Sequence, residues 1–217
     1  MADTALQRKN MVESQIRPSD VTDRRITAAM TIVPRERFLP ASLTAFAYSD
    51  ESLLVKPGRE VLPPRVLAKL IQLAEIAATD KVLVISESGY AAALVAQMAA
   101  KVVALLPGVD DATFAANAIR DVGLTNALAV SGPAAAGWSA GAPYEVVLIE
   151  GGIQQVPDEI KSQLQEKGRL VAVATNDRIG RGVVLHKHSG TLARRDDFQA
   201  AAITLSGFTE PRPAFVF

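Results

Sequence analysis

The sequence predicts an α/β protein built on one doubly wound, mostly parallel β-sheet. Short aliphatic runs alternate with longer stretches whose apolar residues recur every three or four positions, which is typical of strands separated by helices. The clearest strand, 82–85, breaks at a polar turn containing one glycine and is followed by the alanine-rich run 90–100. Strands joined through helices are parallel, and ligands bind beside their carboxyl ends. We therefore expect the turn 86–89 to face any ligand site.

The composition favours a single globular domain and excludes several classes of site. The chain has 217 residues, no cysteine and a net charge of +0, so disulfides and thiol catalysis are excluded. The charge balance argues against nucleic acid or an anionic membrane as a partner, and no apolar run approaches the roughly 20 residues of a membrane span. The start of the chain lacks a signal-peptide pattern, so we expect a cytoplasmic protein. Within the single domain 1–217, we expect a helical extension at 1–78 and the sheet at 79–217.

The first third of the chain is expected to be mainly helical. Pro18 should end the first helix, because the residue before a proline avoids the helical region, and Ser19 or Asp20 can cap the second. Phe38 and Leu39 should anchor the following loop to the core. The expected order is a helix at 3–16, a helix at 21–33, a loop at 34–40, a short apolar piece at 53–55, a turn at 56–58 and a helix at 63–77.

The rest of the chain should form the sheet and end in an antiparallel pair of strands, at 182–187 and 199–205. Glu150 and two glycines follow the fourth expected strand. That carboxylate either faces the ligand crevice or lies solvated in a turn, and we favour the solvated turn. The earlier strands are expected at 82–85, 102–106, 127–130, 144–149 and 170–174, with helices at 90–100, 110–122 and 157–165.

Short motifs point to a known family. They occur in consistent order along the chain: NMVE at 10–13, VPRE at 33–36, SGY at 88–90, GW at 137–138 and GRLV at 168–171. Together they resemble the protein-L-isoaspartate O-methyltransferase family, and the N-terminal block is specific to it among methyltransferases. The resemblance implies a Rossmann-like fold that binds S-adenosyl-L-methionine (AdoMet) and methylates the carboxyl of isoaspartyl residues in damaged proteins. Because a fold alone does not carry a function, each site needs its own comparison.

The positions that serve AdoMet in the family are altered in this chain. The family's glycine-rich turn becomes the turn 86–89, which is one residue shorter and holds one glycine. Leu106 stands at the family's acidic ribose acceptor, and Gly132 at the aspartate that serves adenine. Each buried hydroxyl left without a partner costs about 1–3 kcal/mol. Backbone N–H groups of the turn can still bind a nucleotide; a plain strand-to-helix turn is the alternative. By resemblance, the cofactor-binding positions are Ser86, Glu87, Ser88, Gly89, Leu106 and Gly132.

The substrate segment departs from the family as well. The family sequence GQTISQP corresponds to GREVLPP at 58–64, which places Leu62 where the family has a serine hydroxyl. Its neighbours are Arg59 and Glu60. Arg59 can bind a carboxylate through two parallel hydrogen bonds or lie on the surface as an ordinary arginine. No catalytic residue follows from these three positions.

Two histidines are the remaining candidate ligands. His186 and His188 are one residue apart on an expected strand, so they point to the same side. A metal pair is possible in principle, but the sequence offers no third ligand, and we favour an exposed strand face.

Two functions follow from these departures. The sequence favours a family homologue with weak or lost AdoMet-dependent activity, which acts by binding a protein or peptide partner. The alternative is an active AdoMet-dependent carboxyl methyltransferase that repairs isoaspartyl residues. The oligomeric state stays open.

Overall fold

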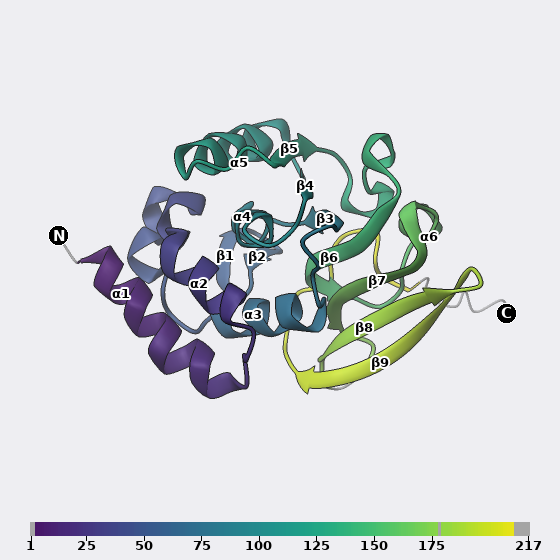
Figure 1. The fold of residues 1–217 in the computed structure, drawn as a ribbon, viewed down its shortest axis with the longest axis horizontal. Helices are drawn as coiled ribbons and strands as arrows, with labels where there is room; N and C mark the ends of the chain where they lie inside the picture. Colours follow the sequence, from purple (N-terminus) through teal and green to yellow (C-terminus); the bar gives the residue numbers. More distant parts are fainter. Residues whose placement is uncertain (1–2, 178, 211–217) are drawn as a thin grey trace, which may run out of the picture.

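A seven-stranded sheet forms the centre of the protein, in the order β5-β4-β3-β6-β7-β8-β9 (Figure 1). The computed structural model describes residues 3–177 and 179–210. Strands β5 to β7 are parallel, and β8 and β9 are antiparallel, which confirms the predicted sheet class and its antiparallel end. The strands are β1 (Leu53–Lys56), β2 (Arg59–Val61), β3 (Lys81–Ile85), β4 (Lys101–Leu106), β5 (Ala127–Ser131), β6 (Tyr144–Ile153), β7 (Leu164–Ala174), β8 (Arg181–His188) and β9 (Thr191–Gln199).

Strand β3 lies inside this sheet, between β4 and β6, as its sequence predicts. Val82, Leu83 and Val84 are fully buried, and Ile85 is 3% exposed. Val82 and Val84 contribute to one apolar cluster, whereas Leu83 and Ile85 contribute to another on the opposite face. A strand buried on both faces has no polar side, which explains its continuous aliphatic run.

Helices cover both faces of the sheet (Figure 1). Helices α3, α4 and α5 pack in the cluster on the Val82 face, and α6 packs in the cluster on the Leu83 face. The N-terminal helices belong to the same apolar cluster as the Val82 face of the sheet. The expected division of the domain at residue 78 stays a prediction. No helix in the described part of the chain is long and apolar enough to cross a membrane. The α-helices are α1 (Thr4–Met11), α2 (Arg24–Ile32), α3 (Pro64–Leu73), α4 (Tyr90–Ala96), α5 (Val109–Asp121) and α6 (Asp158–Gln163).

The N-terminal helices differ from the prediction at their junction. After α1, the chain continues as a π-helix (Val12–Ile16) and a 3₁₀ turn (Arg17–Ser19). Pro18 is tolerated there because the first turn of a helix leaves its N–H groups unpaired. The N-cap of α2 is Asp23, which accepts a hydrogen bond from the N–H of Arg25 at 2.9 Å. The prediction that Ser19 or Asp20 caps this helix is wrong.

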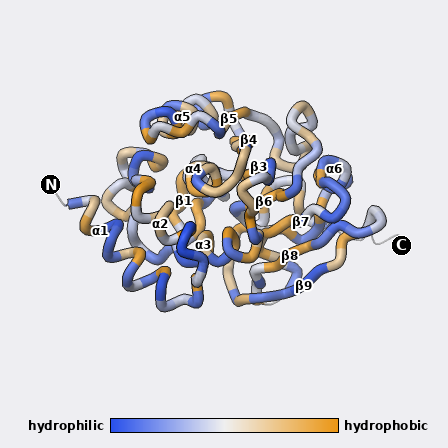
Figure 2. The backbone as a smooth tube through the Cα atoms, in the orientation of Figure 1, coloured by the Kyte–Doolittle hydropathy of each residue, from blue (hydrophilic) through white to orange (hydrophobic). Residues whose placement is uncertain are grey.

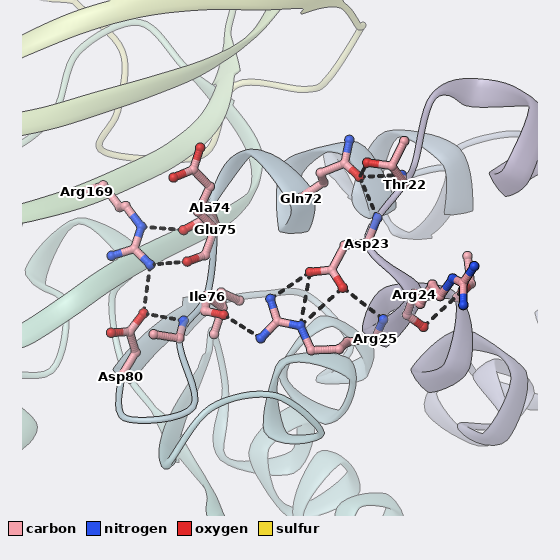
Figure 3. A network of polar contacts seen from close by, with 12 residues as sticks. Thr22, Asp23, Arg24, Arg25, Gln72, Ala74, Glu75, Ile76, Asp80 and Arg169 are labelled. Carbon is pink, nitrogen blue, oxygen red and sulfur yellow. Dashed lines mark hydrogen bonds and ion pairs between the residues drawn. The ribbon is translucent and has the colours of Figure 1, made fainter.

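A polar network ties the N-terminal helices to the sheet (Figure 3). Arg169 in β7 donates to the carbonyls of Ala74 and Glu75 and pairs with Asp80 at 2.7 Å. Arg25 of α2 donates to the carbonyl of Ile76 at 2.9 Å. These arginines bind the carbonyls of the segment that follows α3, which forms no helix or strand of its own.

Strand β6 runs further than predicted. It continues through residues 150–152, where the sequence indicated a turn, and ends at Ile153. Two glycines in this extension leave room for another segment of the chain. A Cβ on Gly151 would lie 2.8 Å from Leu205 Cγ, and one on Gly152 would lie 2.8 Å from the carbonyl oxygen of Ile203. The segment after β9 therefore packs directly against β6.

The last predicted strand, at 199–205, is wrong. The partner of β8 is β9, and within 200–205 only Thr204 makes an isolated bridge, to Gly152. Most side chains of β9 are exposed on both faces, and Figure 2 shows its hydrophilic character. Such an edge strand lacks the apolar alternation by which a strand is recognised.

Candidate functional site

The candidate site lies where the carboxyl ends of β3, β4 and β5 meet. The turn 86–89 connects β3 to α4 at this edge, and the first turn of α5 lies next to it. The β1–β2 hairpin supplies the wall opposite the turn. The structure therefore places the turn at the sheet edge where ligands bind in α/β folds.

Side-chain oxygens of the turn accept hydrogen bonds from the backbone N–H groups of Ser88, Gly89 and Tyr90, whereas the N–H of Ser86 donates to the carbonyl of Leu105 in β4. Ser86 Oγ accepts from the N–H of Ser88 at 3.2 Å and of Gly89 at 3.0 Å. Ser88 Oγ accepts from the N–H of Tyr90 at 3.3 Å. Both serines are buried. Three donors at the start of α4 are thus taken by side chains that a glycine-rich turn would not have.

Gly89 is the one position in the turn where glycine is required. Its φ is +80°, a left-handed conformation that side chains disfavour. A Cβ there would also lie 2.7 Å from Ala115 Cβ in α5. This glycine therefore sets the close packing of α4 against α5.

Glu150 of β6 binds the turn through Ser86. Ser86 Oγ donates to Glu150 Oε2 at 2.7 Å, and the other carboxylate oxygen has no partner within residues 3–177 and 179–210. The side chain is fully buried, so the expectation of a solvated turn carboxylate is wrong. Burial raises the pKa of Glu150 to about 7, although the hydrogen bond from Ser86 and the charge of Arg35 oppose this rise. The carboxylate is buried because β6 continues through this position.

Arg35 is a second buried charge, and the sequence analysis did not single it out. It is fully buried, donates to the carbonyl of Leu62 at 2.8 Å and lies 5.1 Å from the ring centroid of Tyr90. A cation over an aromatic face is attracted by the ring quadrupole. The only sequence signal was its place in the motif VPRE.

Arg59 fastens the β1–β2 hairpin across the crevice. Its guanidinium pairs with Glu87 of the turn and, at 2.9 Å, with Asp111 of α5. Lys56 of the same hairpin pairs with Asp111 at 3.0 Å. Burial raises the pKa of Glu87, and Arg59 opposes this. Four side chains from three elements thus form one ionic bridge, which we call the Arg59 bridge (Lys56, Arg59, Glu87 and Asp111).

Two cavities lie beside this bridge, and Glu87 lines both. The first has a volume of about 360 Å³ and is lined by Phe38, Phe114 and the first turn of α5. The second has a volume of about 310 Å³ and lies over Pro107 and Gly132, at the ends of β4 and β5. Of the sequence-derived positions, Glu87, Ser88, Arg59 and Gly132 line a cavity.

Three sequence-derived positions point into the protein. Leu106 and Leu62 are fully buried in the apolar core. Glu60 is 8% exposed and accepts a hydrogen bond from the N–H of Ile203 at 2.6 Å. Glu60 therefore anchors the hairpin to the segment after β9.

The two histidines lie exposed on β8, as the sequence favoured. Within the described ranges, no group of three or more His, Asp or Glu side chains is placed to hold a metal ion.

Comparison with known proteins places this geometry in context. A model of the protein-L-isoaspartate(D-aspartate) O-methyltransferase (PCMT) family matches residues 6–208. A protein-L-isoaspartate O-methyltransferase of Koribacter versatilis is 31% identical over 191 residues, covering 88% of this chain and 86% of the relative. Another, from Protochlamydia amoebophila, is 36% identical over 162 residues, covering 74% and 77%.

Solved structures agree on the fold. A protein-L-isoaspartate O-methyltransferase superposes with a TM-score of 0.79 at 22% identity, covering 92% of this chain and 66% of the other. A Plasmodium falciparum protein of the same methyltransferase type, solved with S-adenosyl-L-homocysteine, gives a TM-score of 0.76 at 16% identity, covering 91% and 97%. At these identities the likeness shows the Rossmann-like methyltransferase fold.

Proposed function

The chain belongs to the protein-L-isoaspartate O-methyltransferase family, and from that premise we propose that its AdoMet-dependent activity is weak or lost. In this proposal the protein acts by binding a protein or peptide partner. The observation that carries the proposal is the closed turn, in which Ser86 Oγ takes the N–H groups of Ser88 and Gly89. A ligand held at a helix N-terminus needs such N–H groups free.

The residues present do not fit AdoMet. Leu106 offers no acceptor to the ribose hydroxyls, and its side chain is fully buried. Arg59 forms an ion pair with Glu87 of the turn. A cofactor would have to break this ion pair, displace the serine hydroxyls and leave its own hydroxyls without partners, each at about 1–3 kcal/mol.

The alternative is an active carboxyl methyltransferase, and the family match over residues 6–208 favours it. It requires the β1–β2 hairpin to move. The Arg59–Glu87 pair joins a side chain that is 22% exposed to one that is 8% exposed. Separating a largely buried pair leaves the carboxylate without its partner, which costs more than the about 0–1 kcal/mol of an exposed pair. Opening the Arg59 bridge therefore opposes this alternative, as do the closed turn and Leu106.

Calorimetric titration with S-adenosylhomocysteine tests the proposal. We expect weak or no binding to the wild type and to Arg59→Ala, because removing the bridge leaves the turn closed. An intact family member serves as the positive control. A micromolar dissociation constant for the wild type would overturn the proposal. Binding by Arg59→Ala alone would show that the bridge, and not the turn, excludes the cofactor.

Transfer of radiolabelled methyl groups to an isoaspartyl peptide tests activity directly. We expect no substantial turnover beside the intact family member. Turnover within about tenfold of that control would establish the active alternative. A tenfold difference in rate corresponds to about 1.4 kcal/mol of activation free energy.

A further inference from the structure

We propose that the cavity between the first turn of α5 and the β1–β2 hairpin binds a small organic cation with an aromatic or branched apolar body. The cavity has a volume of about 360 Å³, within the range of small-molecule sites. It lies beside the Arg59 bridge and is lined by Glu87 and Ser88, two of the positions that the family resemblance assigns to AdoMet, whereas Gly132 lines the other cavity. The inference therefore rests on the proposed function, in which AdoMet does not occupy the turn 86–89.

The walls of this cavity select an apolar body. Phe38 forms a fixed wall, because it is 1% exposed and packs against Tyr90 with 5.8 Å between ring centroids. Phe114 projects from α5 and is 44% exposed, although it is a large apolar side chain. Val55 of the hairpin completes the apolar lining. A ligand between these side chains would cover the exposed ring of Phe114, and burial of apolar surface is favourable.

The charges around the cavity select a cation. Three carboxylates line it, on Glu87, Asp110 and Asp111. Lys56 and Arg59 neutralise two of them, since both cations bind Asp111 and Arg59 also binds Glu87. Asp110 forms no ion pair with any residue in the described ranges. One negative charge therefore remains at the cavity, beside the exposed ring of Phe114.

An anion would meet the opposite conditions. It would approach three carboxylates, and the two nearby cations, Lys56 and Arg59, are already paired. A neutral apolar ligand would contact the apolar side chains but would gain no electrostatic attraction. The order of affinity should thus be cation, neutral, anion for ligands of one shape.

Titration of 2-phenylethylamine into the wild-type protein, followed by amide chemical shifts, tests this inference. 3-Phenylpropionate has a similar ring and chain with an anionic end and serves as the matched ligand. We expect 2-phenylethylamine to shift amides at 55–56, 88 and 110–114 and to bind at least about fivefold more tightly than the anion. Shifts confined to other surfaces, no saturable shift, or equal binding of the anion would overturn the proposal.

Two variants locate the binding determinants. Phe114→Ala should weaken 2-phenylethylamine binding by about tenfold, whereas Phe46→Ala, at another exposed phenylalanine, should leave it unchanged. Asp110→Asn should remove most of the preference for the cation, and Asp121→Asn, at the other end of α5, should keep it. Urea denaturation of each variant shows whether it is folded. Folded Phe114→Ala or Asp110→Asn proteins that bind like the wild type would overturn the proposal.

Discussion

Replacing Glu150 with glutamine should remove a pH dependence of folding that this buried carboxyl creates. Burial raises the pKa of Glu150 from 4.5 to about 7 in the folded protein, whereas the unfolded chain releases the proton near its ordinary pKa. Between these pH values the folded state binds more protons. The contribution of Glu150 to stability is therefore full below about pH 4.5 and is lost as the pH rises through about 7. The difference corresponds to about 3 kcal/mol of unfolding free energy.

Glutamine keeps the shape of the side chain and can still accept the hydrogen bond from Ser86, but it carries no titrating proton. We expect the wild type to lose about 3 kcal/mol more than Glu150→Gln between about pH 4.5 and about pH 8, because every other titrating group is shared. Urea denaturation at both pH values measures this difference. Glu159→Gln, at an exposed carboxylate in α6, should behave as the wild type. If the unfolding free energies of the wild type and Glu150→Gln changed in parallel with pH, the raised pKa of the buried Glu150 carboxyl would be refuted.

Three further substitutions test the fold and the turn. Ile85→Ala should cost about 2–5 kcal/mol in urea denaturation, since Ile85 is 3% exposed in the central strand; a loss below about 1 kcal/mol would contradict that position. Gly89→Ala should destabilise by about 1–3 kcal/mol, because of its positive φ and the 2.7 Å approach to Ala115; an unchanged urea midpoint would speak against this packing. Neither Leu106→Glu nor a turn 86–89 rebuilt as GTGSG should alone restore S-adenosylhomocysteine binding in calorimetry, whereas together they should, because contacts to one ligand are coupled. Tight binding by Leu106→Glu alone would mean that the present turn already holds the ligand.

The sequence by itself determined the sheet and the family. The aliphatic run 82–85 is buried on both faces of the sheet. Burial on both faces requires an apolar residue at every position, and this pattern is visible in the sequence. The alternation of strands and helices likewise predicted a parallel sheet. The altered turn 86–89 and Leu106 were also visible, because a motif is a local pattern. Edge strand β9 escaped prediction, since exposure on both faces removes the periodicity that marks a strand.

Only the tertiary structure decided how the candidate site is filled. Arg59 meets Glu87 across 28 residues and Asp111 across 52 residues of sequence. Ser86 meets Glu150 across 64 residues. No local pattern encodes such pairs: they arise because the hairpin folds over the sheet edge and because the extension of β6 brings Glu150 to Ser86. The same glycines looked like a turn in the sequence, but they belong to β6 and let the segment after β9 approach closely, and the side chain of Glu150 lies in the core.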